Sequence, residues 1–258
     1  MKIYHNHIPR TGGNYLRDVV YYSLNPKMHI RHPDYFYKSL SLSDLDCDFI
    51  SGHFGIEPLM LDPSIKSFTL LRNPINRLVS HFSVNKYYFN SKEEYDGLSE
   101  YEVFKKWINN EEEMISKSNF QARYLTNGLD NSIEELIVLD RKNETKEEMD
   151  RLHDITMVHG WGITKNEPTY EEALDSLNNM IAFGATENED NFASRLISKI
   201  NDLMDTNHEL KNPFGFKNEE PSSIVLLEQL TEDDIRVISS YNQIDFKLWD
   251  YVMSCDNA

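Results

Sequence analysis

The chain of 258 residues is 40% hydrophobic and 12% aromatic, which is enough for one sizeable core and disfavours wholesale disorder. Its 43 acidic residues against 26 basic ones give a formal net charge of −17, which disfavours nucleic acids and anionic membranes as main partners. Two cysteines without CxxC spacing, no secretory leader pattern and no apolar run of the roughly 18 residues that span a bilayer lead us to expect a cytoplasmic protein without a disulfide framework.

The first predicted unit is a strand, a glycine turn and a helix. Residues 2–8 are rich in strand-forming side chains, the turn reads PRTGG, and apolar residues recur at helical spacing over residues 14–24. A glycine pair at such a junction lets backbone N–H groups converge at the partly positive helix N-terminus, and the arginine and threonine add donors. The alternative for this turn alone is a tight connection with an incidental arginine. The predicted anion-binding residues are Arg10, Thr11, Gly12, Gly13 and Asn14.

A second unit of the same kind follows a brief strand and loop at residues 49–55. A short apolar strand over residues 67–71 precedes Arg72, and Pro74 suits the first turn of a helix. Arg72 therefore stands at the carboxyl end of a strand, where open parallel sheets bind ligands. Ser80, on the following helix, can share an anion with it. A surface ion pair of Arg72 and a solvated serine are the alternative.

The remaining elements alternate between helices and a further strand. Residues 86–118 are acidic, rich in tyrosine and helical in parts, whereas residues 140–167 form a long polar excursion that contains Trp161. The other predicted elements are a helix or strand over residues 131–139, a helix over 168–179, a strand over 180–184, a helix near 188–203 and a loop over 207–223.

Two capping-box patterns mark helix starts in the C-terminal half. Thr186 with Glu189 precedes the helix near 188–203, and Thr231 with Asp234 begins a final amphipathic helix that ends near residue 252. Strands that alternate with helices are typical of a parallel sheet covered on both faces. The sequence therefore predicts an α/β domain with three layers, in which helices flank a central parallel sheet.

Two segments resemble a known family. Residues 7–13, HIPRTGG, resemble the 5′-phosphosulfate loop of carbohydrate sulfotransferases that use 3′-phosphoadenosine-5′-phosphosulfate (PAPS), close to the heparan sulfate 2-O- and 6-O-sulfotransferases, in which the loop reads HxPKTGG. Arg10 stands where that family usually has lysine, and it keeps the charge while adding a second donor. Residues 71–82, LRNPINRLVSHF, resemble the family's 3′-phosphate site, LRxPxxRxxSxF, in which Arg77 is expected to support the helix. Neither GxxxxGKS/T nor GxGxxG occurs, which disfavours ordinary nucleotide kinases and nicotinamide enzymes.

The resemblance implies a P-loop-like fold that binds PAPS, releases the bisphosphate product PAP and needs no metal. It implies that Arg10, Thr11 and the backbone amides of residues 12–14 hold the phosphosulfate group. It also implies that Arg72 and Ser80 hold the 3′-phosphate at the other end of the same nucleotide. The two motifs should therefore lie close together in the folded chain.

Histidine suits a general base because its reference pKa is about 6.5. The resemblance implies His53 for this role, with Glu57 as the second candidate, and Arg10 as the group that stabilises charge on the departing phosphate. Lys211 lies in a stretch that resembles a loop closing over the nucleotide and is expected to touch a phosphate. Residues 119–125, NFQARYL, resemble the family's NxQxRxL stretch, for which structural or cofactor-side contacts are expected.

Together these patterns predict a single domain over residues 1–258 that moves a sulfuryl group from PAPS to a hydroxyl acceptor, which kinship implies to be a saccharide. Residues 86–118 and 140–167 are the expected insertions near the acceptor. One alternative is a P-loop-like kinase acting on a small alcohol or nucleoside, although no Walker lysine or magnesium carboxylate is visible. Another is a non-catalytic PAP- or nucleotide-binding protein of the same fold. A metal pair at His5 and His7 would lack an evident third ligand.

Overall fold

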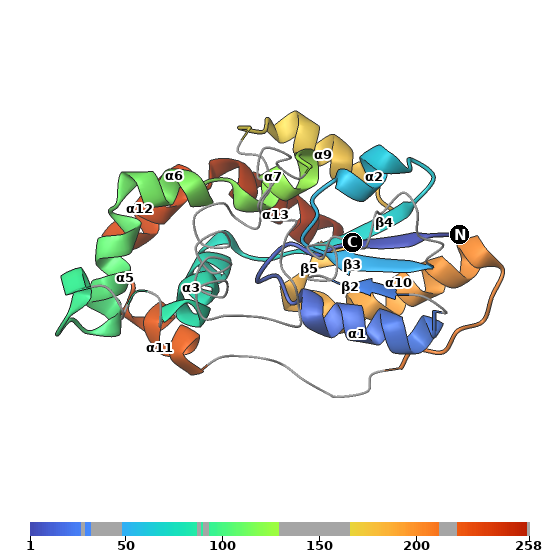
Figure 1. The fold of residues 1–258 in the computed structure, drawn as a ribbon, viewed down its shortest axis with the longest axis horizontal. Helices are drawn as coiled ribbons and strands as arrows, with labels where there is room; N and C mark the ends of the chain where they lie inside the picture. Colours follow the sequence, from blue (N-terminus) through green and yellow to red (C-terminus); the bar gives the residue numbers. More distant parts are fainter. Residues whose placement is uncertain are drawn as a thin grey trace, which may run out of the picture.

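The computed structural model describes residues 1–26, 29–31, 48–86, 89, 93–128, 166–211 and 221–256, and it contains a five-stranded sheet in the order β2-β3-β1-β4-β5 (Figure 1). The strands are β1 (Ile3–Asn6), β2 (His29–Arg31), β3 (Phe49–Gly52), β4 (Lys66–Leu71) and β5 (Ala182–Ala185). Each neighbouring pair is parallel. The predicted parallel α/β sheet is confirmed, and β2 is an edge strand that sequence reasoning missed.

The central strand β1 sets the geometry of the site. It is buried along its whole length and pairs with β3 on one side and β4 on the other, with His5 opposite both Ser51 and Phe68. Parallel strands end at the same edge of a sheet, and ligands of such sheets bind outside that edge. The segments that follow β1, β3 and β4 therefore begin next to one another at the carboxyl edge.

Helices cover both faces of the sheet (Figure 1). On one face, α1 (Gly13–Leu24) and α10 (Glu189–Met204) pack their apolar sides against residues of β1, β3 and β4. On the other face lie α7 (Phe120–Thr126), α9 (Tyr170–Asn178) and α13 (Gln243–Asp256). This arrangement confirms the three layers that the alternation of elements predicted.

A further group of helices lies beyond the carboxyl edge, at the left of Figure 1. Its core is aromatic: Trp107 packs near Phe82, Phe89 and Phe104, with ring centroids 5.5 to 6.0 Å from that of the tryptophan. The described part of the predicted insertion at 86–118 is packed into this core. The members are α3 (Pro74–Val84), α5 (Glu100–Ile108), α6 (Glu111–Lys117), α11 (Pro221–Gln229) and α12 (Glu232–Tyr241).

The predicted final helix is two helices in the structure. The Thr231–Asp234 capping box is confirmed at the start of α12. The helix is interrupted at Asn242, however, before α13 begins. At the break, the backbone N–H of Asn119 donates to the Tyr241 carbonyl (3.1 Å), and the Asn119 side chain accepts from the Ile244 amide (2.9 Å). The prediction of one helix was wrong because a residue distant in sequence supplies partners to both helix ends.

The predicted Thr186–Glu189 capping box is also wrong. A 3₁₀ turn, Thr186–Asn188, precedes α10, and the N-cap Asn188 makes no side-chain cap hydrogen bond. The Thr186 hydroxyl lies instead 2.7 Å from the Thr11 carbonyl and 3.1 Å from the Leu71 carbonyl. Thr186 therefore joins the turn after β1 to the end of β4, which local spacing does not reveal.

Several short elements and one long segment differ from expectation or fall outside the description. Sequence reasoning did not resolve α2 (Glu57–Leu61), α6, α7 or α11, and the predicted loop over 207–223 ends earlier because α11 begins at Pro221. The predictions for 131–139 and for 140–165, with Trp161, lie outside the described residues. Among the helices that are described, none is both long and apolar enough to cross a membrane.

Candidate functional site

The turn after β1 adopts a conformation that glycine favours. Arg10 and Gly12 both have positive φ, 71° and 79°, and α1 begins at Gly13 with Gly12 as its N-cap. The Thr11 hydroxyl donates to the Ile8 carbonyl (2.9 Å), so its proton is already used in a hydrogen bond within the turn. Contact of Thr11 with an anion would therefore come from its backbone. Asn14 lies in the first turn of α1, where its side chain accepts from Arg17 (3.1 Å).

His7 packs directly against the start of α1. A methyl group added at Gly13 would lie 2.0 Å from His7 Cδ2 and 2.3 Å from His7 Nε2, so the imidazole ring occupies the space that any other side chain would need. Gly13 is therefore required by this close approach. Sequence reasoning considered His7 only as half of a metal pair and missed its packing role.

Replacement of Gly13 with alanine is expected to destabilise the fold by about 1–3 kcal/mol, because the ring and the start of α1 must move apart. Thermal unfolding should show a Tm lower by about 2–4 °C per kcal/mol. The matched comparison is His7→Ala with His7→Ala/Gly13→Ala. Since the single change at His7 removes the clashing ring, Gly13→Ala should cost much less in that background. Equal costs in the two backgrounds would show that the ring is not the obstacle.

The structure brings the two motifs that were predicted to bind anions into contact. The Arg10 guanidinium donates through Nε (3.1 Å) and Nη2 (2.9 Å) to the Ser80 hydroxyl, although the residues are 70 positions apart. Arg72 Nη1 donates to the Arg10 carbonyl (3.3 Å). Asn73 caps α3 by accepting from the amides of the first helical turn, and this sets the direction in which Ser80 is presented. Two arginines and a helix N-terminus thus meet at the carboxyl edge.

His53 lies beside the same turn. Its ring centroid is 4.4 Å from that of His7, and its Nδ1 is hydrogen-bonded to the His7 carbonyl. A carbonyl only accepts, so Nδ1 carries the proton and Nε2 carries the lone pair. Burial lowers the pKa of His53 from 6.5 to about 4; the charges of Arg17 and Arg10 act in the same direction, and the His7 carbonyl opposes them. His53 is therefore neutral at pH 7 and has an Nε2 that can accept a proton.

His5, in β1, and His7, just after that strand, form a stack. The rings of His5 and His7 are 5.0 Å apart and nearly parallel, His5 also stacks on Phe68 (4.8 Å), and its Nδ1 lies 3.1 Å from Ser51 Oγ. In the part of the chain that the structure describes, no three histidine, cysteine or acidic side chains are grouped as they would be around a metal ion.

The structure places the remaining two predicted residues, Lys211 and Glu57, by contacts outside the motifs at 7–13 and 72–82. The backbone N–H of Lys211 donates to Ser23 Oγ (2.9 Å). Ser23 lies near the C-terminal end of α1, about 15 Å along the helix from Gly13 for a rise of about 1.5 Å per residue. The structure therefore does not bring the Lys211 backbone to the turn. Glu57 begins α2, where its Oε2 lies 2.5 Å from the position of a Cβ at Gly128, beside the described end of α7.

Arg77 lies within the protein rather than at its surface. Its side chain is fully buried, and its guanidinium carbon lies 4.3 Å above the ring centroid of Phe120, a cation–π contact. Burial lowers the pKa of Arg77 to about 10, while the Asp245 carboxylate opposes that shift. The expected supporting role agrees with this placement, since Arg77 joins α3 to the start of α7.

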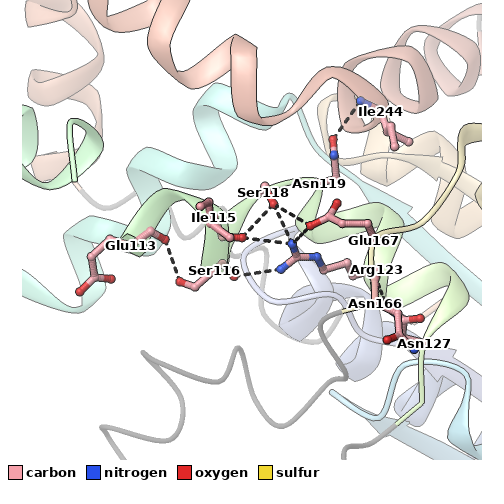
Figure 2. Close-up of polar contacts among 10 residues, drawn as sticks. All are labelled: Glu113, Ile115, Ser116, Ser118, Asn119, Arg123, Asn127, Asn166, Glu167 and Ile244. Atoms are coloured by element: carbon pink, nitrogen blue, oxygen red, sulfur yellow. Dashed lines mark hydrogen bonds and ion pairs between the residues drawn. The ribbon is translucent and has the colours of Figure 1, made fainter. Parts of the chain in front are cut away.

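Within residues 119–125, Asn119 and Arg123 serve the packing of helices (Figure 2). Arg123 donates to the carbonyls of Ile115 (3.1 Å) and Ser116 (3.3 Å) and to Ser118 Oγ (2.7 Å), and it pairs with Glu167. These contacts hold the α6–α7 turn against the chain that leads into α9. Gln121, the glutamine of the predicted NxQxRxL stretch, points instead toward Arg72. No local pattern identified Arg72 as its partner, nor the carbonyls of Thr11 and Leu71 as the partners of Thr186.

Comparison with known proteins gives one finding. A family model described as the sulfotransferase family matches residues 1–252, nearly the whole chain, including every predicted site residue. No curated protein matches the sequence.

Proposed function

Because this chain belongs to the sulfotransferase family, we propose that it transfers a sulfuryl group from PAPS to a hydroxyl group of a saccharide and releases PAP. The observation that carries the proposal is the contact of Arg10 with Ser80 and of Arg72 with the Arg10 carbonyl. Residues from two distant motifs thereby form one cationic site, which suits a nucleotide that is phosphorylated at two positions. This positive charge is a local feature of the site, because the chain as a whole carries a net charge of −17.

The residues present fit such a ligand. Arginine forks grip phosphate oxygens in pairs, and the amides at the start of α1 add donors where the helix is partly positive. An anionic oxygen is a stronger acceptor than the neutral Ser80 hydroxyl, so a bound phosphate competes well for the donors of Arg10. By this proposal Arg10 and residues 11–14 hold the phosphosulfate, and Arg72 and Ser80 hold the 3′-phosphate.

When bound, PAPS supplies the sulfuryl group and a phosphate leaving group; the chain positions them and moves one proton. His53 takes the proton of the acceptor hydroxyl at Nε2, because its Nδ1–H is held by the His7 carbonyl. Arg10 stabilises negative charge on the departing phosphate, an electrostatic contribution that dominates transfers of this kind. The hydrogen bond from His53 to the carbonyl of His7, the first residue of the 7–13 loop, holds the base next to the loop that carries Arg10.

The acceptor is proposed to approach from the side on which His53 lies. Residues 86–118 remain the proposed acceptor-side insertion within the domain, and their described part belongs to the helices beyond the carboxyl edge of the sheet. The proposed insertion at 140–167 is described only at residues 166 and 167.

Thermal shift with nucleotides tests the donor. We expect PAP at 100 times its dissociation constant to stabilise the chain by about 2.7 kcal/mol, which raises Tm by about 5 °C or more. ATP with magnesium at the same concentration should have little effect, because the chain has no Walker motif. Stabilisation by ATP with magnesium alone would favour the kinase instead.

Incubation with PAPS and a set of saccharides tests the transfer. We expect mass spectrometry to detect a saccharide that has gained one SO₃ group, with equimolar PAP released. The Arg72→Ala variant, which keeps His53 and Arg10, is the control for donor-independent modification. Tight PAP binding without transfer to any saccharide offered would contradict the proposed activity and favour a non-catalytic nucleotide-binding protein.

A further inference from the structure

Arg72 is the first residue after β4, which ends at Leu71. The pairing of β4 with β5 ends at Leu71, which lies opposite Ala185. At the next position the side chain of Gln121 takes over: its Oε1 accepts from the Arg72 amide (2.9 Å), and its Nε2 donates to the Arg72 carbonyl (2.9 Å). One side-chain amide thus makes both hydrogen bonds that a neighbouring strand would make.

Gln121, whose side chain holds the backbone of Arg72, is itself held by a third part of the chain. Gln121 is fully buried in α7, and the Asp245 carboxylate of α13 accepts from the amides of Gln121 (3.0 Å) and Ala122 (2.8 Å). Asp245 is fully buried too, and burial raises the pKa of its carboxyl despite these two donors. A buried carboxylate that accepts from two amides fixes the start of α7, and with it the backbone from which the Gln121 side chain extends.

The consequence for the site lies in the direction of Arg72. With both backbone groups of residue 72 fixed, its side chain leaves the sheet toward the loop and reaches the Arg10 carbonyl (3.3 Å). We propose that Gln121 is a positioning residue that orders Arg72 for the 3′-phosphate of the nucleotide, an assignment of ligand that rests on the proposed function. By this proposal Gln121 does not contact the ligand. It restricts Arg72 before the ligand binds, so that less conformational entropy of Arg72 is lost on binding.

The test compares two nucleotides that differ in the 3′-phosphate. Gln121→Met keeps the length of the side chain but makes neither hydrogen bond, and Gln121→Glu keeps the acceptor while opposing a carboxylate to the Arg72 carbonyl. Calorimetry should show PAP binding weakened about 10-fold or more in both variants, with AMP binding within about 2-fold of wild type. Leu125→Val, a buried change on the same helix, is the stability control and should leave the ratio of PAP to AMP affinity unchanged.

Hydrogen exchange of the Arg72 amide supplies a readout without ligand. We expect faster exchange in Gln121→Met than in Leu125→Val. Unchanged PAP affinity in both Gln121 variants, or equal losses for PAP and AMP, would overturn the positioning role. If wild-type protein bound neither nucleotide, the proposed function and the 3′-phosphate role would both fall, whereas the exchange result would still report whether Gln121 orders Arg72. The failures are therefore distinguishable.

Discussion

Replacing His53 with alanine is expected to lower turnover about 100-fold or more while PAP affinity stays within about 2-fold of wild type. The reason is geometric. His53 contributes an Nε2 lone pair beside the loop, whereas the proposed phosphate contacts come from Arg10, Arg72 and the start of α1. A general base is needed only when the acceptor hydroxyl attacks, so its loss should appear in kcat rather than in the binding of the donor product.

Steady-state rates and PAP calorimetry on the same preparations separate these effects. His208→Ala is the matched control, because His208 is hydrogen-bonded through its backbone to Asn201 at the end of α10, away from the loop. It should keep full turnover. Near-normal turnover in His53→Ala would remove His53 from the role and leave Glu57 as the candidate base.

The pH dependence follows from the lowered pKa of His53. A base with a pKa of about 4 in the free enzyme stays neutral throughout the physiological range, so the acid limb of kcat/KM should lie near 4 rather than 6.5. The same shift affects stability, because His53 is protonated at a higher pH in the unfolded chain than in the folded one. Its contribution to the free energy of unfolding is therefore complete above about pH 6.5 and is lost as pH falls toward 4. An NMR titration of the imidazole that gave a value near 6.5 would contradict its burial.

Sequence reasoning predicted local structure best where local chemistry dictates it. Proline and glycine restrict the backbone so strongly that PRTGG could only be a turn between strand and helix, and Pro74 marked the start of α3 for the same reason. The parallel sheet then followed from alternation of elements. Because parallel strands share a carboxyl edge, the proximity of Arg10 to Arg72 and Ser80 was also predictable.

What sequence reasoning missed depends on contacts between distant residues. Nothing local to Gln121 indicates that its amide pairs with Arg72, 49 positions away, or that Asp245 anchors its backbone, 124 positions away. Thr186 had the right spacing for a capping box, yet two carbonyls at the sheet edge took its hydroxyl. A side chain with several possible partners takes the one that the assembled fold presents, so such roles require the structure.

Arg10 is expected to show a trade between stability and activity. It adopts positive φ (71°), a region that costs a residue with a side chain about 1–2 kcal/mol and that glycine enters freely. Strain of this kind persists only where the surrounding structure holds it, and it is frequent at functional sites. Arg10→Ala and Arg10→Gly both remove the guanidinium and its bonds to Ser80, but only the glycine variant also relieves the backbone.

Both variants should therefore lose about 100-fold or more in kcat/KM, the effect of removing a donor that stabilises developing charge. Their stabilities should differ: Arg10→Gly should unfold above Arg10→Ala by about 2–4 °C for each kcal/mol of backbone strain that the glycine relieves. The alanine variant carries the strain without the charge, so it isolates the backbone term from the loss of the Ser80 contact. Equal melting temperatures would mean that the loop relaxes once the guanidinium is gone, and the positive φ of Arg10 would then be a consequence of its hydrogen bonds rather than a property imposed by the turn.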